Sequence, residues 1–219
     1  MKFSKEDIKK SMLLYAITDR MWLKNGESLT NICEEVIKNG ATFLQIREKD
    51  LDKETFEIES KELKLLCNKY RVPFVVNDSV EIAMQINADG VHVGQSDIKG
   101  RDIRSIIGTD KILGISAGTI EEAIAAENAE ADYIGVGAVF VTNTKKNAEN
   151  ISMEKLYEIR NSVSIPVVAI GGINKENISE LSRSKVNGVA VISAIFGAKD
   201  IGKATKELLL LAKDMINIG

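Results

Sequence analysis

The sequence has few of the residues on which many enzymes depend: one histidine, two cysteines and two prolines among 219 residues. One histidine excludes any site that needs two, such as the His-x-x-x-His pair of zinc enzymes. Two cysteines, Cys33 and Cys67, exclude a disulfide framework and a four-thiolate zinc site. Because both cysteines fall in segments with a helical pattern, we expect them to pack in apolar surroundings.

Strong charge of one sign and long apolar runs are also missing. The 29 basic and 32 acidic residues almost balance, so the composition predicts no binding of nucleic acid. No run approaches the ~18 apolar residues of a membrane span, and the N-terminal MKFSKEDIKKSM lacks an apolar core of signal-peptide length. We therefore expect a cytoplasmic protein that binds neither nucleic acid nor membranes. A homo-oligomer is left open.

What the sequence does contain is an alternation of short β-rich runs and longer helical patterns. Eight strand–helix pairs in 219 residues give about 27 residues each, close to the roughly 24 of a strand, a helix and two short loops. This pattern predicts parallel strands with both sheet faces covered. The expected strands begin at Leu13, Thr42, Pro73, Gly90, Ile112, Tyr133, Pro166 and Gly188, and the expected helices cover residues 29–38, 53–70, 80–86, 102–107, 120–129, 153–160, 175–183 and 203–216.

Eight such units favour a single closed (β/α)₈ barrel, a TIM barrel, over residues 1–219. The first 12 residues are expected to form an N-terminal helical extension. A doubly wound open sheet is the alternative. In a barrel of this kind, chemistry is built at the carboxyl ends of the strands, so the residues that follow each strand are the candidates for a site.

Cationic residues follow the second expected strand. Gln45, Arg47 and Lys49 alternate along the chain and therefore project to one side if the strand continues. Inward-facing cations at the open end of a barrel suit a diphosphate, since arginine supplies a planar fork and lysine a point charge. A solvated turn whose charges pair locally is the alternative.

Two carboxylates, Asp78 and Asp97, follow the third and fourth expected strands. Carboxylates at neighbouring strand ends can share one hard cation, and Mg²⁺ typically takes one or two of them together with phosphate oxygens of a substrate. Each aspartate also precedes an expected helix and could instead be its N-cap. Their place beside Arg47 and Lys49 favours the metal site.

Glycines follow the seventh strand, at Gly171 and Gly172, and Ser193 follows the eighth. The loops after these two strands form the usual phosphate site of such barrels. Glycines of an ordinary tight turn are the alternative.

One motif points to a different enzyme class and is rejected. Gly114-Ile115-Ser116-Ala117-Gly118 matches the Gly-x-Ser-x-Gly nucleophile elbow, but that hydrolase needs a histidine after the serine. The single histidine, His92, precedes it. We expect His92 to be a packed or hydrogen-bonded residue of the barrel, and not a catalytic base.

Seven segments, in this order and spacing, resemble thiamine-phosphate synthase. The resemblance runs from about Leu14 to about Ile201, and the seven together are highly specific. They are QIREK at residues 45–49, PFVVND at 73–78, ADGVHVGQSD at 88–97, GIS at 114–116, DYIGVGAVFVTNTKK at 132–146, VVAIGGI at 167–173 and GVAVISAI at 188–195.

The resemblance implies a TIM barrel that joins a hydroxymethylpyrimidine diphosphate to a thiazole phosphate, giving thiamine phosphate and pyrophosphate. It implies dissociative loss of diphosphate with the help of one Mg²⁺ held by Asp78 and Asp97. By position, the pyrimidine substrate would be held by Gln45, Ile46, Arg47, Glu48, Lys49, Asn77, Ser116 and Lys145, with Arg47, Lys49, Ser116 and Lys145 catalytic, and the thiazole phosphate by Thr142, Asn143, Thr144, Gly172, Ile192 and Ser193.

Two positions depart from many relatives: Gly118 stands where they carry histidine, and Val141 where they carry proline. The first puts an acid–base role at that position in doubt, and the second removes a fixed φ angle. The alternatives are a thiazole tautomerase-like isomerase and a non-catalytic ligand-binding barrel. Neither needs Arg47, Lys49 and the two aspartates as a set.

Overall fold

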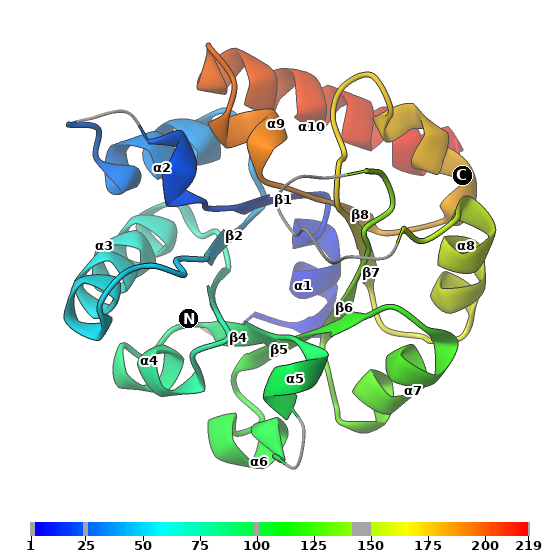
Figure 1. Cartoon of the computed structure of the whole chain (residues 1–219), viewed down its shortest axis with the longest axis horizontal. Coiled ribbons are helices and arrows are strands. Elements are labelled where there is room, and N and C mark those ends of the chain that lie inside the picture. The colour runs from blue at the N-terminus through cyan, green and yellow to red at the C-terminus, as the bar shows by residue number, and fades with distance from the viewer. Residues whose placement is uncertain (1–2, 24–25, 99–100, 142–149, 219) are drawn as a thin grey trace.

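The protein folds into a closed barrel of eight parallel strands surrounded by helices (Figure 1). The computed structural model describes residues 3–23, 26–98, 101–141 and 150–218. Strands pair in chain order, and β8 closes the barrel on β1, which confirms the predicted TIM barrel and rules out the open sheet. The strands are β1 (Leu14–Ile17), β2 (Phe43–Ile46), β3 (Phe74–Asn77), β4 (Gly90–Val93), β5 (Ile112–Ala117), β6 (Tyr133–Val136), β7 (Val167–Ile170) and β8 (Gly188–Val191).

The helices agree with the sequence pattern to within a few residues, and most begin at a residue whose side chain caps them. Three short helices were not predicted: η1, α5 and α9. The helices are α1 (Lys5–Ser11), η1 (Arg20–Trp22), α2 (Leu29–Lys38), α3 (Lys53–Tyr70), α4 (Val80–Gln85), α5 (Gln95–Ile98), α6 (Ile103–Ile107), α7 (Ile120–Asn128), α8 (Met153–Asn161), η2 (Ile178–Ser184), α9 (Ser193–Phe196) and α10 (Ile201–Ile218).

One element differs in type from the expectation. Residues 178–184 form the 3₁₀ helix η2 and not an α-helix. Its buried residues Ile178, Leu181 and Ser184 are spaced by three, a repeat that a 3₁₀ helix places on one face. The apolar spacing alone could not distinguish the two helix types.

Two apolar cores explain why the strands are apolar on both faces. The outer core lies between strands and helices and includes Cys33 and Cys67, both unpaired and buried as expected. Burial raises the pKa of both thiols well above its usual range, so neither is a ready nucleophile. The inner core fills the barrel with Tyr15, Phe43, Val75, Ile112, Tyr133, Val168 and Ala190, among others.

Helix α1 closes the amino end of the barrel. A capping box between Ser4 and Asp7 begins the helix, and its Ile8 packs with Met12 into the inner core. Figure 1 shows α1 within the ring of strands. The predicted helical extension is therefore a plug that covers the inner core, and the opposite end of the barrel is left for a site. No helix in the described ranges is both long and apolar enough to cross a membrane.

Candidate active site

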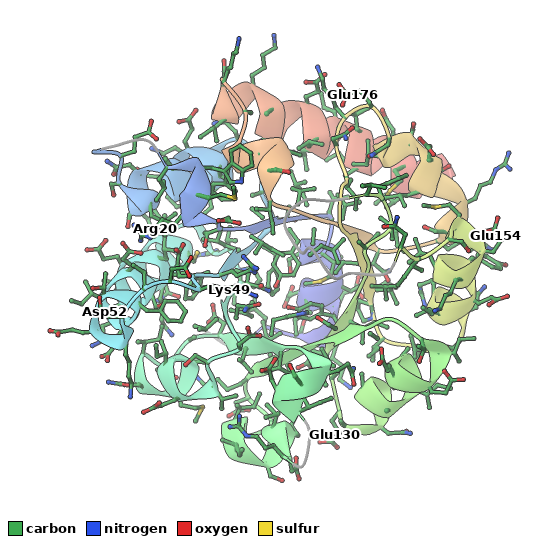
Figure 2. All side chains as sticks on the ribbon, viewed as in Figure 1. Arg20, Lys49, Asp52, Glu130, Glu154 and Glu176 are labelled. Carbon is green, nitrogen blue, oxygen red and sulfur yellow. The ribbon has the colours of Figure 1, made fainter. Side chains whose placement is uncertain are left out.

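A cavity of about 530 Å³ opens among the carboxyl ends of the strands. Each of the eight strands contributes at least one residue to the lining of this cavity. In Figure 2, Lys49 lies near the centre of this end, whereas Asp52, Glu130, Glu154 and Glu176 lie around the outside of the molecule. Among the lining residues are Ile17, Gln45, Arg47, Lys49, Asn77, Asp78, His92, Asp97, Ser116, Gly118, Glu122, Gly135, Ile170, Gly172, Ile192 and Ser193.

The alternation predicted after β2 is present. Gln45, Arg47 and Lys49 line the cavity, whereas Ile46 and Glu48 do not. Ile46 is buried in the outer core, and the side chain of Glu48, only 2% exposed, pairs with Arg20 at 3.1 Å. Burial raises the pKa of Glu48 above its usual range, although Arg20 opposes the shift. The side chain of Glu48 therefore ties the loop after β2 to the residues that follow β1.

The residues that hold Arg47 in place follow the end of β1 and were not among the predicted site residues. The Arg47 peptide N–H donates to Thr18 Oγ1 at 2.9 Å, and its Nη1 lies 3.6 Å from Asp19 Oδ2. Thr18 Oγ1 also donates to Glu48 Oε1 at 3.2 Å. Thr18 and Asp19 directly follow the first strand, so the strand-end rule could have found them.

Asp78 and Asp97 meet at the wall of the cavity. Burial and the neighbouring Asp97 carboxylate raise the pKa of Asp78. Asp78 has a φ of +61°, a backbone region that few residues other than glycine adopt. Ser79 is the N-cap of α4, so Asp78 does not cap it, and Asp97 lies inside α5, where its Oδ2 accepts the Gly94 N–H at 2.9 Å.

This pair fits Mg²⁺. Two carboxylates in contact, one of them on strained backbone, supply the hard oxygen ligands that this ion prefers. The described residues contain no group of three or more His, Cys, Asp or Glu side chains placed to hold a metal. An ion bound here would complete its coordination with water and substrate oxygens, as Mg²⁺ does at phosphate sites.

Ser116 lies at the end of β5 on the same cavity. Its Oγ is 3.0 Å from His92 Nε2, and its carbonyl oxygen accepts a hydrogen bond from Gln95 Nε2 at 2.7 Å. His92 Nδ1 is 3.0 Å from the Tyr133 hydroxyl. His92 is thus a hydrogen-bonded residue of the barrel, as expected, but it also lines the cavity.

The loop after β7 lies close against the loop after β6. Gly171 and Gly172 have φ angles of +101° and +66°, and a Cβ on Gly172 would lie 2.5 Å from the carbonyl oxygen of Val141. These positions require glycine. Ile192 and Ser193, where α9 begins, line the cavity with them. The structure therefore brings Gly172, Ile192 and Ser193 together.

Four predicted site residues, Thr142, Asn143, Thr144 and Lys145, lie outside the described residues. Of the two departures, Val141 is exposed. Gly118 lines the cavity, and its peptide N–H donates to Glu122 Oε2 at 2.6 Å. A Cβ on Gly118 would have its nearest neighbour at 3.5 Å, so this position has room for a side chain.

Known proteins match almost the whole chain. The family model described as thiamine monophosphate synthase matches residues 14–195. Thiamine-phosphate synthase of Clostridium tetani is 49% identical over 89% of this chain and 93% of its own length. Thiamine-phosphate synthase of Clostridium novyi is 50% identical over 89% of this chain and 96% of its own length. The structure of thiamine phosphate pyrophosphorylase from Pyrococcus furiosus superposes with a TM-score of 0.87 at 38% identity, over 95% of this chain and 99% of that one. The chain belongs to the thiamine monophosphate synthase family.

Proposed function

We propose that the protein condenses 4-amino-2-methyl-5-hydroxymethylpyrimidine diphosphate with 4-methyl-5-(2-phosphooxyethyl)thiazole, giving thiamine phosphate and pyrophosphate. The observation that carries the proposal is the set of charges on one cavity. Arg47 and Lys49 face it together with Asp78 and Asp97. A diphosphate with its counter-ion needs both cations and metal ligands, whereas a monophosphate alone needs neither carboxylate.

Mg²⁺ is the metal that Asp78 and Asp97 would hold, with one ion per site. When bound, it supplies charge neutralisation for the diphosphate. The guanidinium of Arg47 and the ammonium of Lys49, which follow β2, bind the same group. Lys145, predicted to join them, stays a prediction.

The reaction proceeds by dissociative loss of the diphosphate. The bond between the methylene carbon of the pyrimidine and the diphosphate oxygen breaks, and the electron pair leaves with the oxygen. Arg47 and Lys49 stabilise the negative charge that develops there. The ring nitrogen of the thiazole then forms a bond to the methylene cation. Because no protein nucleophile takes part, burial of Cys33 and Cys67 is no obstacle.

Positioning of the two substrates is the remaining task. The polar side chains of Gln45, Asn77 and Ser116 line the cavity and would orient the pyrimidine. Gly172, Ile192 and Ser193 lie at the ends of β7 and β8 and would hold the thiazole phosphate, with Thr142, Asn143 and Thr144 as further predicted contacts. Holding acceptor and cation in line removes much of the entropy cost of meeting.

The test is a stoichiometry. The purified chain, both substrates and Mg²⁺ are expected to release pyrophosphate and form thiamine phosphate in equal amounts, and neither product is expected when one substrate is omitted. A tautomerase-like isomerase would act on the thiazole alone and release no pyrophosphate. A binding barrel would form no product. Either result would overturn the proposal. The expectations of a cytoplasmic protein that binds neither nucleic acid nor membranes, and of an open oligomeric state, stay predictions.

A further inference from the structure

A chain of hydrogen-bonded side chains crosses the inside of the barrel beneath the cavity. Gln45 Nε2 donates to the Tyr15 hydroxyl, which lies 2.8 Å from the Tyr133 hydroxyl. The Tyr133 hydroxyl is 3.0 Å from His92 Nδ1, and His92 Nε2 is 3.0 Å from Ser116 Oγ. The five residues come from five strands. Gln45 and Ser116, the two ends of the chain, both line the cavity.

Two glycines leave the space that this chain occupies. A Cβ on Gly114 would lie 2.2 Å from Tyr133 Cζ and 2.5 Å from His92 Nδ1. A Cβ on Gly135 would lie 3.3 Å from His92 Cε1. Gly114 is the first glycine of the Gly-x-Ser-x-Gly motif, for which the hydrolase interpretation was rejected. Its role here is to admit the ring of Tyr133 beside His92.

The hydrogens of the chain can be ordered by counting donors. The Gln45 amide donates to the Tyr15 oxygen. When every hydroxyl hydrogen is used within the chain, the Tyr15 hydrogen points to the Tyr133 oxygen and the Tyr133 hydrogen to His92 Nδ1. Burial raises the pKa of both tyrosines, so both keep their hydrogen. In the neutral imidazole, Nδ1 then accepts, and the ring hydrogen is on Nε2, where it donates to Ser116 Oγ.

We propose that Tyr133, supported by Tyr15, is a positioning residue: it keeps the His92 hydrogen on Nε2 and thereby leaves the Ser116 hydrogen free to be donated to the pyrimidine substrate. The identity of that substrate rests on the proposed function, but the tautomer of His92 does not. Rigid packing supports this role, since Tyr15 and Tyr133 are fully buried and pack edge to face with ring centroids 5.8 Å apart.

The test uses the fact that His92 is the one histidine of the chain. In protein labelled with ¹⁵N and carrying no histidine tag, long-range ¹H–¹⁵N spectra report a single imidazole and distinguish its tautomers. The wild-type protein is expected to show the Nε2–H form. Tyr133→Phe removes the hydroxyl that Nδ1 accepts from, and is expected to raise the share of the Nδ1–H form.

Kinetics supply the second measurement. Tyr133→Phe is expected to lower kcat by about tenfold, the effect of one lost hydrogen bond in the reacting complex, with little change in KM for the thiazole phosphate. Tyr70→Phe is the matched control: its hydroxyl donates to Glu34, away from the cavity. It is expected to keep both the tautomer and kcat.

Three results would overturn the proposal. They are a wild-type imidazole with its hydrogen on Nδ1, an unchanged tautomer in Tyr133→Phe, and an unchanged kcat in that variant. A loss of kcat with the tautomer retained would assign Tyr133 a purely structural role. Because the spectra need no substrate, a wild-type protein that shows the expected tautomer but releases no pyrophosphate would overturn the proposed function and not the hydrogen-bond order.

Discussion

Arg47 is held in place by the protein's own groups. Its peptide N–H is bound by Thr18, its guanidinium lies beside Asp19, and its side chain is 17% exposed. A guanidinium has five N–H donors, so this arrangement leaves several of them for a ligand in the cavity. The fork of donors is thus oriented before a diphosphate arrives, which lowers the entropy cost of binding it.

Arg47→Ala is therefore expected to lower kcat/KM for pyrophosphate release by about 10²–10³-fold. Arg47→Lys is expected to restore only part of the loss, because lysine keeps the charge but not the planar fork. Arg183→Ala, which removes an exposed arginine of η2, is the control and is expected to be neutral. Normal activity of Arg47→Ala would show that Arg47 does not bind the diphosphate.

Gly114→Ala tests the space beside His92. The new Cβ would fall 2.2 Å from Tyr133 Cζ, and the buried ring has little room to move. We expect the free energy of unfolding to fall by about 1–3 kcal/mol, as for other overpacked cores, measured by denaturant unfolding. Gly118→Ala, whose Cβ would have its nearest neighbour at 3.5 Å, is expected to leave it nearly unchanged. Equal stability of the two variants would contradict this account.

At the scale of elements, ion pairs join η1 to the loop after β2 and to α3. Arg20, on η1, pairs with Glu48 after β2 and with Glu59 on α3. Burial raises the pKa of Glu48 in the folded protein above its ordinary value. The folded protein therefore loses stability as a rising pH ionises this carboxyl. Arg20 offsets that cost whenever Glu48 is ionised.

Arg20→Ala is expected to lower the free energy of unfolding by about 1–3 kcal/mol at pH 7, a range reduced for the partial exposure of Arg20. The loss is expected to shrink as the pH falls below the raised pKa of Glu48, because a protonated carboxyl needs no cation. Urea unfolding at pH 7 and pH 4.5 measures both values. Lys53→Ala, which removes an exposed pair with Glu81, is the control. A loss that does not depend on pH would contradict this role of Glu48.

Helix α1 contributes to stability from the end of the barrel opposite the cavity. Ile8, 3% exposed, packs into the inner core. Ile8→Ala is expected to lower the free energy of unfolding by about 2–4 kcal/mol, the cost of a cavity in a core, and to leave KM for both substrates unchanged. Lys9→Ala on the exposed face is the control. A raised KM in Ile8→Ala would mean that the plug also shapes the site.

Local rules predicted much of this structure. The period of two along a strand placed Gln45, Arg47 and Lys49 on the cavity, because that period is a property of the backbone itself. Eight strand–helix pairs favoured the barrel, but only the pairing of β8 with β1 excluded an open sheet. These rules could not predict the hydrogen-bond chain, because it depends on which inward-facing residues of different strands lie at the same level in the barrel. Tyr15 and Tyr133, for example, are 118 residues apart in the sequence. The tilt of the strands sets those levels.

Long-range partners were likewise beyond the sequence. Glu48 was expected at the substrate, yet the structure pairs its side chain with Arg20, 28 residues earlier. The N-cap alternatives for Asp78 and Asp97 could be decided only from backbone angles and hydrogen bonds. Local pattern predicts which side of an element a residue lies on, and tertiary structure decides its partner.

For the whole molecule, closure of the barrel assembles the site. Cations after β2 and carboxylates after β3 and β4 face one cavity, while α1 covers the other end of the inner core. The central claim is that this cavity is one site for a diphosphate and its metal ion, with Asp78 and Asp97 as the metal ligands.

The most direct test measures the ion itself, with Mn²⁺ as a paramagnetic substitute for Mg²⁺ and pyrophosphate as the partner ligand. Electron paramagnetic resonance of the wild-type protein is expected to show one bound Mn²⁺ per chain when pyrophosphate is present. Asp97→Asn is expected to lose that ion while its Tm stays equal or rises, because a like-charge contact is removed. Asp102→Asn, at the N-cap of α6, is expected to bind as the wild type does. Undiminished Mn²⁺ binding by Asp97→Asn would contradict the account.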